Sequence, residues 1–188
     1  MNGWGIGVLR EQPSSPDASG ASGGRSGPDI RVAAATPDDV PAILSLIQGL
    51  GEYERLAHEV VATEERLRET LFGDNPAAEV LMATVGGEPV GFALFFRSYS
   101  TFLARSGIYL EDLFVRPAWR GRGVGRRLLA QVARLAVERG CGRLEWAVLD
   151  WNEDALRFYR RLGAVPLSDW TVHRVSGSAL SALASSGD

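Results

Sequence analysis

A glycine-rich loop between an aliphatic segment and an amphipathic segment constrains the fold of this 188-residue chain more than any other feature. The loop reads Arg-Gly-Arg-Gly-Val-Gly-Arg over residues 120–126. The apolar run 108–115 before it predicts a strand that ends ahead of Pro117. Leucines, valines and alanines at helical spacing predict a helix over 125–139 after the loop. The chain must therefore contain a sheet with a helix packed against it.

The rest of the chain alternates between the same two kinds of pattern. Strands are expected at 30–33, 79–85, 89–97, 143–149, 164–167 and 171–175. Helices are expected from the N-cap Thr36 to near Gly49 or Gly51, over 63–72 behind a capping box, and over 152–162. These elements predict an α/β fold with a central mixed sheet covered by helices.

Composition predicts one folded domain, over residues 30–175, with a tail at each end. Residues 12–29 are mostly Ser, Gly, Pro, Ala and Asp, so we expect 1–29 to be disordered, and we expect 176–188 to be flexible. The only cysteine, Cys141, permits no intramolecular disulfide, which favours a reducing compartment. There is no secretory signal pattern and no apolar run of the roughly 18 residues that span a bilayer, so we expect a cytoplasmic protein without membrane partners.

The basic residues exclude several functions. The net charge is −3, which argues against nucleic acid as a partner. All 20 basic residues are arginine, so a Walker A lysine, a Schiff-base lysine and a lysine nucleophile are excluded. His58 and His173 are isolated, so no metal site is expected.

The glycine loop has the composition of an anion site. Glycines let the backbone approach a ligand closely, and loop amides with a helix N-terminus present N–H groups to a phosphate. The surrounding arginines suit a pyrophosphate. A tight strand-to-helix turn with solvated arginines remains the alternative. Two other phosphate-binding motifs are excluded. The dinucleotide fingerprint requires a third glycine where this chain has Arg126, and the P-loop requires a lysine, which this chain lacks.

Two motifs, in the same order along the chain as in a known family, resemble that family's signatures. The pattern Arg120-x-x-Gly123-x-Gly125, after a strand and before a helix, resembles the acetyl-CoA pyrophosphate loop of the GNAT superfamily of acyl-CoA N-acyltransferases. Residues 150–164, in which Asn152 begins a helix that ends in Phe-Tyr-x-x-x-Gly, resemble its second signature. Residues 51–54, 108–115 and 151–153 narrow the resemblance to the diamine (spermidine/spermine) and thialysine acetyltransferase branch.

The resemblance implies a mostly antiparallel, twisted sheet, acetyl-CoA as co-substrate, a small amine as acceptor, no metal and a homodimer. An aminoglycoside, an amino acid or a protein N-terminus stays open as the acceptor. A non-catalytic acetyl-CoA sensor on the same fold also stays open.

The resemblance also assigns cofactor contacts. On the strand they are Leu113, whose N–H would meet the thioester carbonyl, with Phe114 and Val115. In the loop they are Arg120, Gly121, Arg122, Gly123, Val124, Gly125 and Arg126. Asn152 and Arg160 complete the set, although Asn152 could be simply a helix N-cap.

The candidate catalytic residues are a carboxylate, Glu111, and a phenol, Tyr159. The resemblance makes Glu111 the base for the amine, and an ordinary strand carboxylate or arginine partner is the alternative. Tyr159 would be the general acid, because a phenol is protonated at neutral pH, and a core aromatic is its alternative. Strand alternation predicts that Asp112 faces the opposite side from Glu111, where it could bind the amine or be structural. The acidic and aromatic run 52–54 predicts either a site entrance that attracts cations or a solvated loop, with Glu52, Tyr53 and Glu54 as its residues.

Overall fold

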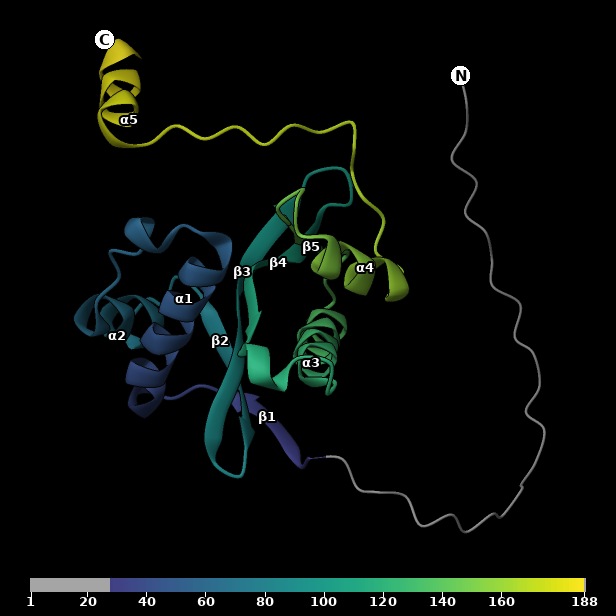
Figure 1. The fold of residues 1–188 in the computed structure, drawn as a ribbon. Helices are drawn as coiled ribbons and strands as arrows, with labels where there is room; N and C mark the ends of the chain where they lie inside the picture. The colour runs from purple at the N-terminus through teal and green to yellow at the C-terminus, as the bar shows by residue number, and fades with distance from the viewer. Residues whose placement is uncertain (1–27, 188) are drawn as a thin grey trace, which may run out of the picture.

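The computed structural model describes residues 28–187 as a five-stranded sheet with helices on both faces (Figure 1). The strands are β1 (Ile30–Ala34), β2 (Glu79–Val85), β3 (Glu88–Ser100), β4 (Arg105–Val115) and β5 (Leu144–Trp146), which lie in that order in the sheet. Neighbours from β1 to β4 are antiparallel, and β5 runs parallel to β4. The expected mixed, mostly antiparallel sheet is confirmed. Residues 1–27, and with them most of the expected N-terminal tail, lie outside the described residues.

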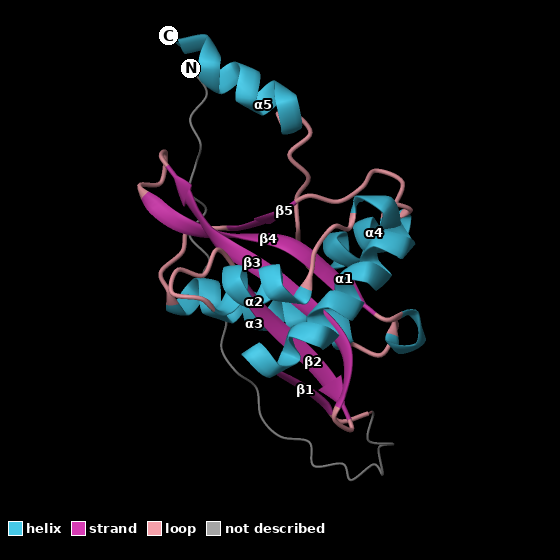
Figure 2. Cartoon of the chain, turned by 90° about the vertical axis from the view of Figure 1, so that its left-hand side faces the viewer, coloured by secondary structure: helices cyan, strands magenta, loops and turns pink. Residues whose placement is uncertain are grey.

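Five α-helices accompany the sheet: α1 (Val40–Glu54), α2 (Glu64–Phe72), α3 (Val124–Glu138), α4 (Glu153–Arg161) and α5 (Gly177–Ala184). Helices α1 and α2 cover one face, and α3 and α4 lie on the other (Figures 1 and 2). Strand alternation divides the core accordingly: Phe92 and Phe114 pack with α1 and α2, whereas Phe95 and Leu110 pack with α3. No helix in the described part of the chain is long and apolar enough to cross a bilayer.

Strand β4 carries an irregularity that the sequence does not reveal. Phe95 of β3 pairs with Leu110, but the preceding residue Leu94 pairs with Asp112, so Glu111 is an extra residue in β4. Such a bulge breaks the alternation of side chains along a strand. The pairing of β4 with β5 ends at Leu110 and Trp146. Beyond that pair the two segments separate, directly at Glu111.

The predicted helix ends differ from the structure at both ends of α1, because Thr36 caps a short helical turn, Pro37–Asp39, and Asp39 is the N-cap of α1 itself. The Thr63 hydroxyl accepts from the backbone N–H of Arg66 (3.3 Å), so the predicted N-cap of α2 is confirmed. Helix α1 continues to Glu54, past both predicted ends. Gly51 is buried, and a Cβ there would lie 2.6 Å from Val60 Cγ2, so this glycine permits close packing rather than ending the helix.

The C-terminal part differs most from the sequence prediction. The predicted strands 164–167 and 171–175 do not form, and β5 is three residues long instead of covering 143–149. Residues 164–176 instead run away from the body of the domain and lead to α5, which lies where a flexible tail was expected (Figure 1). A strand forms only when a neighbour pairs with it, and this segment has none within the described chain.

Candidate active site

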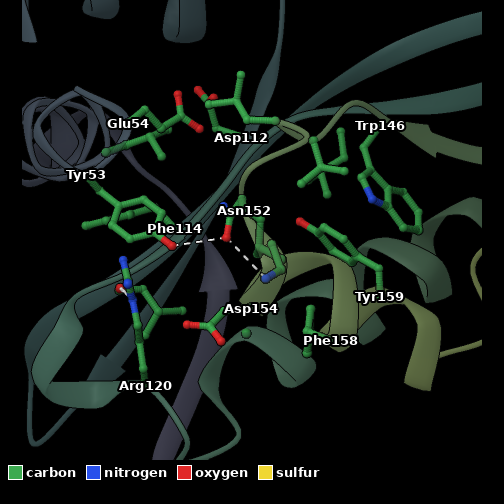
Figure 3. Close-up of a pocket in the computed structure, with 18 of the residues that line it drawn as sticks. Tyr53, Glu54, Asp112, Phe114, Arg120, Trp146, Asn152, Asp154, Phe158 and Tyr159 are labelled. Atoms are coloured by element: carbon green, nitrogen blue, oxygen red, sulfur yellow. Dashed lines mark hydrogen bonds between the residues drawn. The ribbon is translucent and has the colours of Figure 1, made fainter. Parts of the chain in front are cut away.

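A cavity of about 790 Å³ lies where β4 and β5 separate (Figure 3). One wall is β4 from Leu110 to Val115, and the opposite wall is the segment 146–149 with the start of α4. The glycine loop and the start of α3 lie at one end, and the end of α1 lies at another. The cavity therefore brings together four segments that are far apart in the sequence, including both family motifs.

The glycine loop turns as its composition predicts. Gly121 (φ 70°) and Gly123 (φ 86°) adopt the left-handed backbone conformation that favours glycine. Gly123 is the N-cap of α3 and provides no side chain to cap its first amides. Val124, only 1% exposed, anchors the helix in the core. The N-terminus of α3 therefore presents uncapped N–H groups beside the cavity, which is the geometry of a phosphate site.

The loop arginines have different positions. Arg120 and Arg126 line the cavity. The Arg120 guanidinium lies 4.1 Å from the ring centroid of Tyr53, and its Nε donates to the Val115 carbonyl (3.0 Å). Arg122 is outside the lining and stacks on the Trp119 ring at 4.9 Å. Arg120 is thus better placed than Arg122 to bind an anion in the cavity.

Asn152 is a helix N-cap, one of the two roles considered from sequence, and it also lines the cavity where a cofactor contact was expected. Its Oδ1 accepts from the backbone N–H of Ala155 (3.2 Å), so it is the N-cap of α4. The same oxygen accepts from the Tyr53 hydroxyl (3.1 Å), and Asn152 lines the cavity (Figure 3). The end of α1 and the start of α4 are thereby joined across the opening.

Tyr159 lies inside the cavity wall, on the side of α4 that faces β5. Its ring packs against those of Trp146 (centroids 4.9 Å apart) and Phe158 (5.2 Å). Burial, and then the negative charge of Glu54, raise the pKa of the Tyr159 hydroxyl to about 12. The hydroxyl is therefore protonated at neutral pH and available as a hydrogen-bond donor.

The carboxylates contradict the prediction that Glu111 and Asp112 face opposite sides of the sheet. Leu110 and Leu113 both pack into the α3-side core, three positions apart, so the two residues between them share the α1 side. The bulge at Glu111 is the physical reason. Both carboxylates line the main cavity and also a second cavity of about 540 Å³ beneath α1 and α2, and Glu54 borders both cavities too.

Glu54, Glu111 and Asp112 form an acidic cluster, and two of its members, Glu54 and Asp112, have raised pKa values. Burial, followed by the charges of Glu111 and Glu54, raises the pKa of Asp112 from 3.8 to about 6. Burial also raises the pKa of Glu54. A cation placed among these three groups would relieve their repulsion, so the cluster is suited to an ammonium.

Three predicted site residues do not line the main cavity: Glu52, Arg122 and Arg160. Glu52 and Arg160 are exposed, and Glu52 also lies outside the second cavity. Conversely, Trp146 and Leu149 line the cavity and were not predicted as site residues. The signal available for them was position alone, since both lie in the expected strand 143–149, whose first half pairs with β4.

Replacing Asp112 by Asn is expected to stabilise the fold at neutral pH. Because the folded pKa exceeds the unfolded one, Asp112 contributes stability that is fully present below about pH 4 and is lost as pH rises through about 6. Asn resembles the protonated form and keeps that contribution. The difference between 3.8 and about 6 corresponds to about 3 kcal/mol at most.

Thermal melting of wild type and Asp112→Asn at pH 4 and pH 7.5 measures this effect. The variant should melt higher at pH 7.5 and equally at pH 4, and Asp150→Asn, at an exposed position, should change neither. A variant that melts lower than wild type at pH 7.5 would show that the Asp112 carboxylate is stabilised by its surroundings.

Comparison with known proteins gives the class of protein that this fold and cavity define. The sequence signature of the acetyltransferase (GNAT) family matches residues 47–164. The structure is similar to an integron cassette protein of Vibrio cholerae, with a TM-score of 0.72 and 24% identity over 85% of this chain and 100% of that one. The chain belongs to the acetyltransferase (GNAT) family.

Curated relatives specify the activity further. A thialysine N-epsilon-acetyltransferase of Bos taurus is 40% identical over 166 residues, which is 82% of this chain and 97% of the relative. An L-ornithine N5-acetyltransferase of Arabidopsis thaliana is 35% identical over 198 residues, which is 81% of this chain and 87% of the relative. This chain is an N-acetyltransferase, as the sequence motifs predicted.

Proposed function

We propose that this enzyme transfers an acetyl group from acetyl-CoA to a primary amine of a small cationic molecule such as thialysine, ornithine or a polyamine. The observation that carries the proposal is the cluster of Glu54, Glu111 and Asp112 at the wall shared by the two cavities. Burial, followed by the charges of Glu111 and Glu54, raises the pKa of Asp112, so a cationic ligand beside these carboxylates would favour their charged forms. The names of the two relatives, which act on amino acids with a side-chain amine, support the same class of acceptor.

Acetyl-CoA would occupy the main cavity. The N-terminus of α3 and Arg120 would hold its pyrophosphate, and Asn152 would contact the pantetheine arm. The thioester would then lie between β4 and Tyr159, next to the bulge. The backbone N–H of Leu113 is the proposed donor to the thioester carbonyl oxygen, where negative charge develops during the reaction.

The chemical step is a direct transfer. The ammonium first loses a proton to Glu111, because only a neutral amine has a lone pair. The amine nitrogen attacks the thioester carbonyl carbon, and the resulting oxyanion is stabilised by the Leu113 N–H. Collapse breaks the carbon–sulfur bond, and the thiolate leaves under a hydrogen bond from Tyr159. Tyr159 gives its proton to the thiolate and regains one from the attacking nitrogen, so the products are an amide and CoA thiol, and Glu111 releases the first proton to solvent.

Asp112 has the complementary role of binding the acceptor. It is more buried than Glu111 and shares the wall with Glu54, so the two would hold the distal ammonium while Glu111 serves the reacting one. A non-catalytic acetyl-CoA sensor is the second candidate function. It would need the phosphate site alone and gives no reason for a buried carboxylate cluster or for Tyr159 inside the cavity.

Glu54→Gln is expected to raise KM for a cationic acceptor about tenfold, leaving KM for acetyl-CoA within twofold. The reason is the loss of a charge that binds the acceptor equally in the ground and transition states, worth about 1.4 kcal/mol. Glu52→Gln is the matched control, because Glu52 is two residues away and lines neither cavity. Steady-state kinetics with ornithine and thialysine test this. Equal effects of the two substitutions would remove the acidic cluster from acceptor binding.

A homodimer and a cytoplasmic location, both expected from the sequence, also remain proposals.

A further inference from the structure

The second cavity, of about 540 Å³, lies beneath α1 and α2 and adjoins the main one. The acidic cluster of Glu54, Glu111 and Asp112 lines both cavities, so the two meet at these carboxylates. Most of the side chains that line the second cavity alone are apolar: Ile47, Val60, Val61, Ala62 and Leu67. An acceptor whose amine lies at the cluster therefore has apolar walls for its hydrocarbon chain and room for a further group beyond it.

Two charged residues line the second cavity without lining the main one, Glu59 and Arg66. The Glu59 carboxylate lies 3.3 Å from Nε2 of His58. Arg66, at the third position of α2, makes hydrogen bonds within residues 28–187 through its backbone alone, and its guanidinium has no salt bridge there. The guanidinium of Arg66 therefore keeps its donors for a ligand or for water.

This arrangement of charge suits an acceptor that carries a carboxylate as well as amines. The acidic cluster lies at the wall between the two cavities, whereas Arg66 lies on a part of the second cavity that does not border the main one. An α-amino acid with a side-chain amine has a carboxylate next to its distal ammonium, and a guanidinium binds a carboxylate through paired hydrogen bonds. A polyamine offers only cations, which Arg66 would repel.

We propose that Arg66 is a specificity-determining residue that binds the α-carboxylate of the acceptor, so that the enzyme takes α-amino acids with a side-chain amine in preference to polyamines. The inference rests on the proposed function and keeps its roles for the acidic cluster. The side-chain amine lies at Glu111, and the α-ammonium lies at Glu54 and Asp112. The carboxylate, attached to the same carbon as the α-ammonium, extends from there to Arg66.

Ornithine and 1,4-diaminobutane form a matched pair of ligands, because they have the same chain and the same two amines and differ only in the carboxylate. Calorimetry on the full chain saturated with CoA measures the binding of each without any turnover. Wild type should bind ornithine more tightly than 1,4-diaminobutane. Arg66→Gln should weaken ornithine about tenfold, the low end for a hydrogen bond to a charged group, because Arg66 is exposed and solvent screens its charge.

The same Arg66→Gln variant should bind 1,4-diaminobutane as tightly as wild type or more tightly, since the substitution removes a repelling charge. Arg66→Lys keeps the charge without the planar fork, so it should recover part of the lost ornithine affinity. Arg68→Gln is the matched control. Arg68 lies two residues further along α2, lines neither cavity, and donates to the Pro37 carbonyl, so its loss should change neither dissociation constant.

Equal changes in both dissociation constants in Arg66→Gln would overturn the proposal. A wild type that binds 1,4-diaminobutane as tightly as ornithine, or that binds neither ligand, would overturn it too. Failure of the proposed function is seen separately, as an absence of acetyl transfer to either amine in a kinetic assay. The calorimetric comparison would still decide the role of Arg66 in that case, because it requires binding and no catalysis.

Discussion

Tyr159→Phe is expected to lower kcat about 100-fold while acetyl-CoA binding stays within twofold of wild type. Proton donation by a positioned side chain contributes roughly 10²–10⁴-fold in rate. We expect the low end of this range for two reasons. The pKa of Tyr159, raised to about 12, keeps its hydroxyl protonated at neutral pH but makes it a weak acid. The CoA thiolate is also a fair leaving group, and water can replace part of the lost donation.

Steady-state kinetics, calorimetry with CoA and thermal melting of this variant separate catalysis from packing. The phenylalanine ring keeps the contacts with Trp146 and Phe158, so the melting temperature should change little. Tyr99→Phe, at an exposed position on β3, is the matched control and should leave kcat unchanged. A kcat within twofold of wild type would remove Tyr159 from the mechanism and leave it as a core aromatic.

Gly123→Ala is expected to weaken acetyl-CoA binding at least about tenfold, or about 1.4 kcal/mol. At φ 86° an alanine is strained, so the loop should relax and turn its N–H groups away from the phosphate position. Gly87→Ala is a closely matched control: Gly87 has the same φ of 86°, also has open space around its Cα, and lies in the β2–β3 turn.

The two glycine variants should lose similar stability, roughly 1–2 kcal/mol each, because the backbone strain is the same. They should differ in the dissociation constant for CoA measured by calorimetry, which only Gly123→Ala should raise. Equal affinities in both variants would contradict the assignment of the glycine loop to the pyrophosphate.

Elements with strong local signals could be predicted from the sequence. The strand 79–85, the N-cap Thr63 and the N-cap Asn152 occur where the pattern places them. Their causes lie within a few residues: alternating apolar positions in a strand, or a side-chain oxygen three residues before an amide. The cavity residues Arg120, Asn152 and Tyr159 were predicted too, although from the family resemblance rather than from local physics.

Features that depend on distant partners could not be predicted. The bulge at Glu111 is defined by its pairing with β3, and a run of alternating residues gives no sign of an extra one. Gly51 was interpreted as a possible helix end because the sequence does not reveal its close packing against Val60, which is a tertiary contact. The segment 171–175 has the composition of a strand but pairs with no neighbour among residues 28–187, so composition alone gave the wrong assignment.

Release of CoA thiol from acetyl-CoA in the presence of a panel of amines tests the central claim most directly. Thialysine, ornithine and spermidine would be compared with an uncharged primary amine and with no acceptor, and mass spectrometry would check for a singly acetylated product. The proposed function predicts thiol release with at least one cationic amine at a rate roughly tenfold or more above both controls. Tight acetyl-CoA binding with no release above background for any amine would contradict it and identify a sensor.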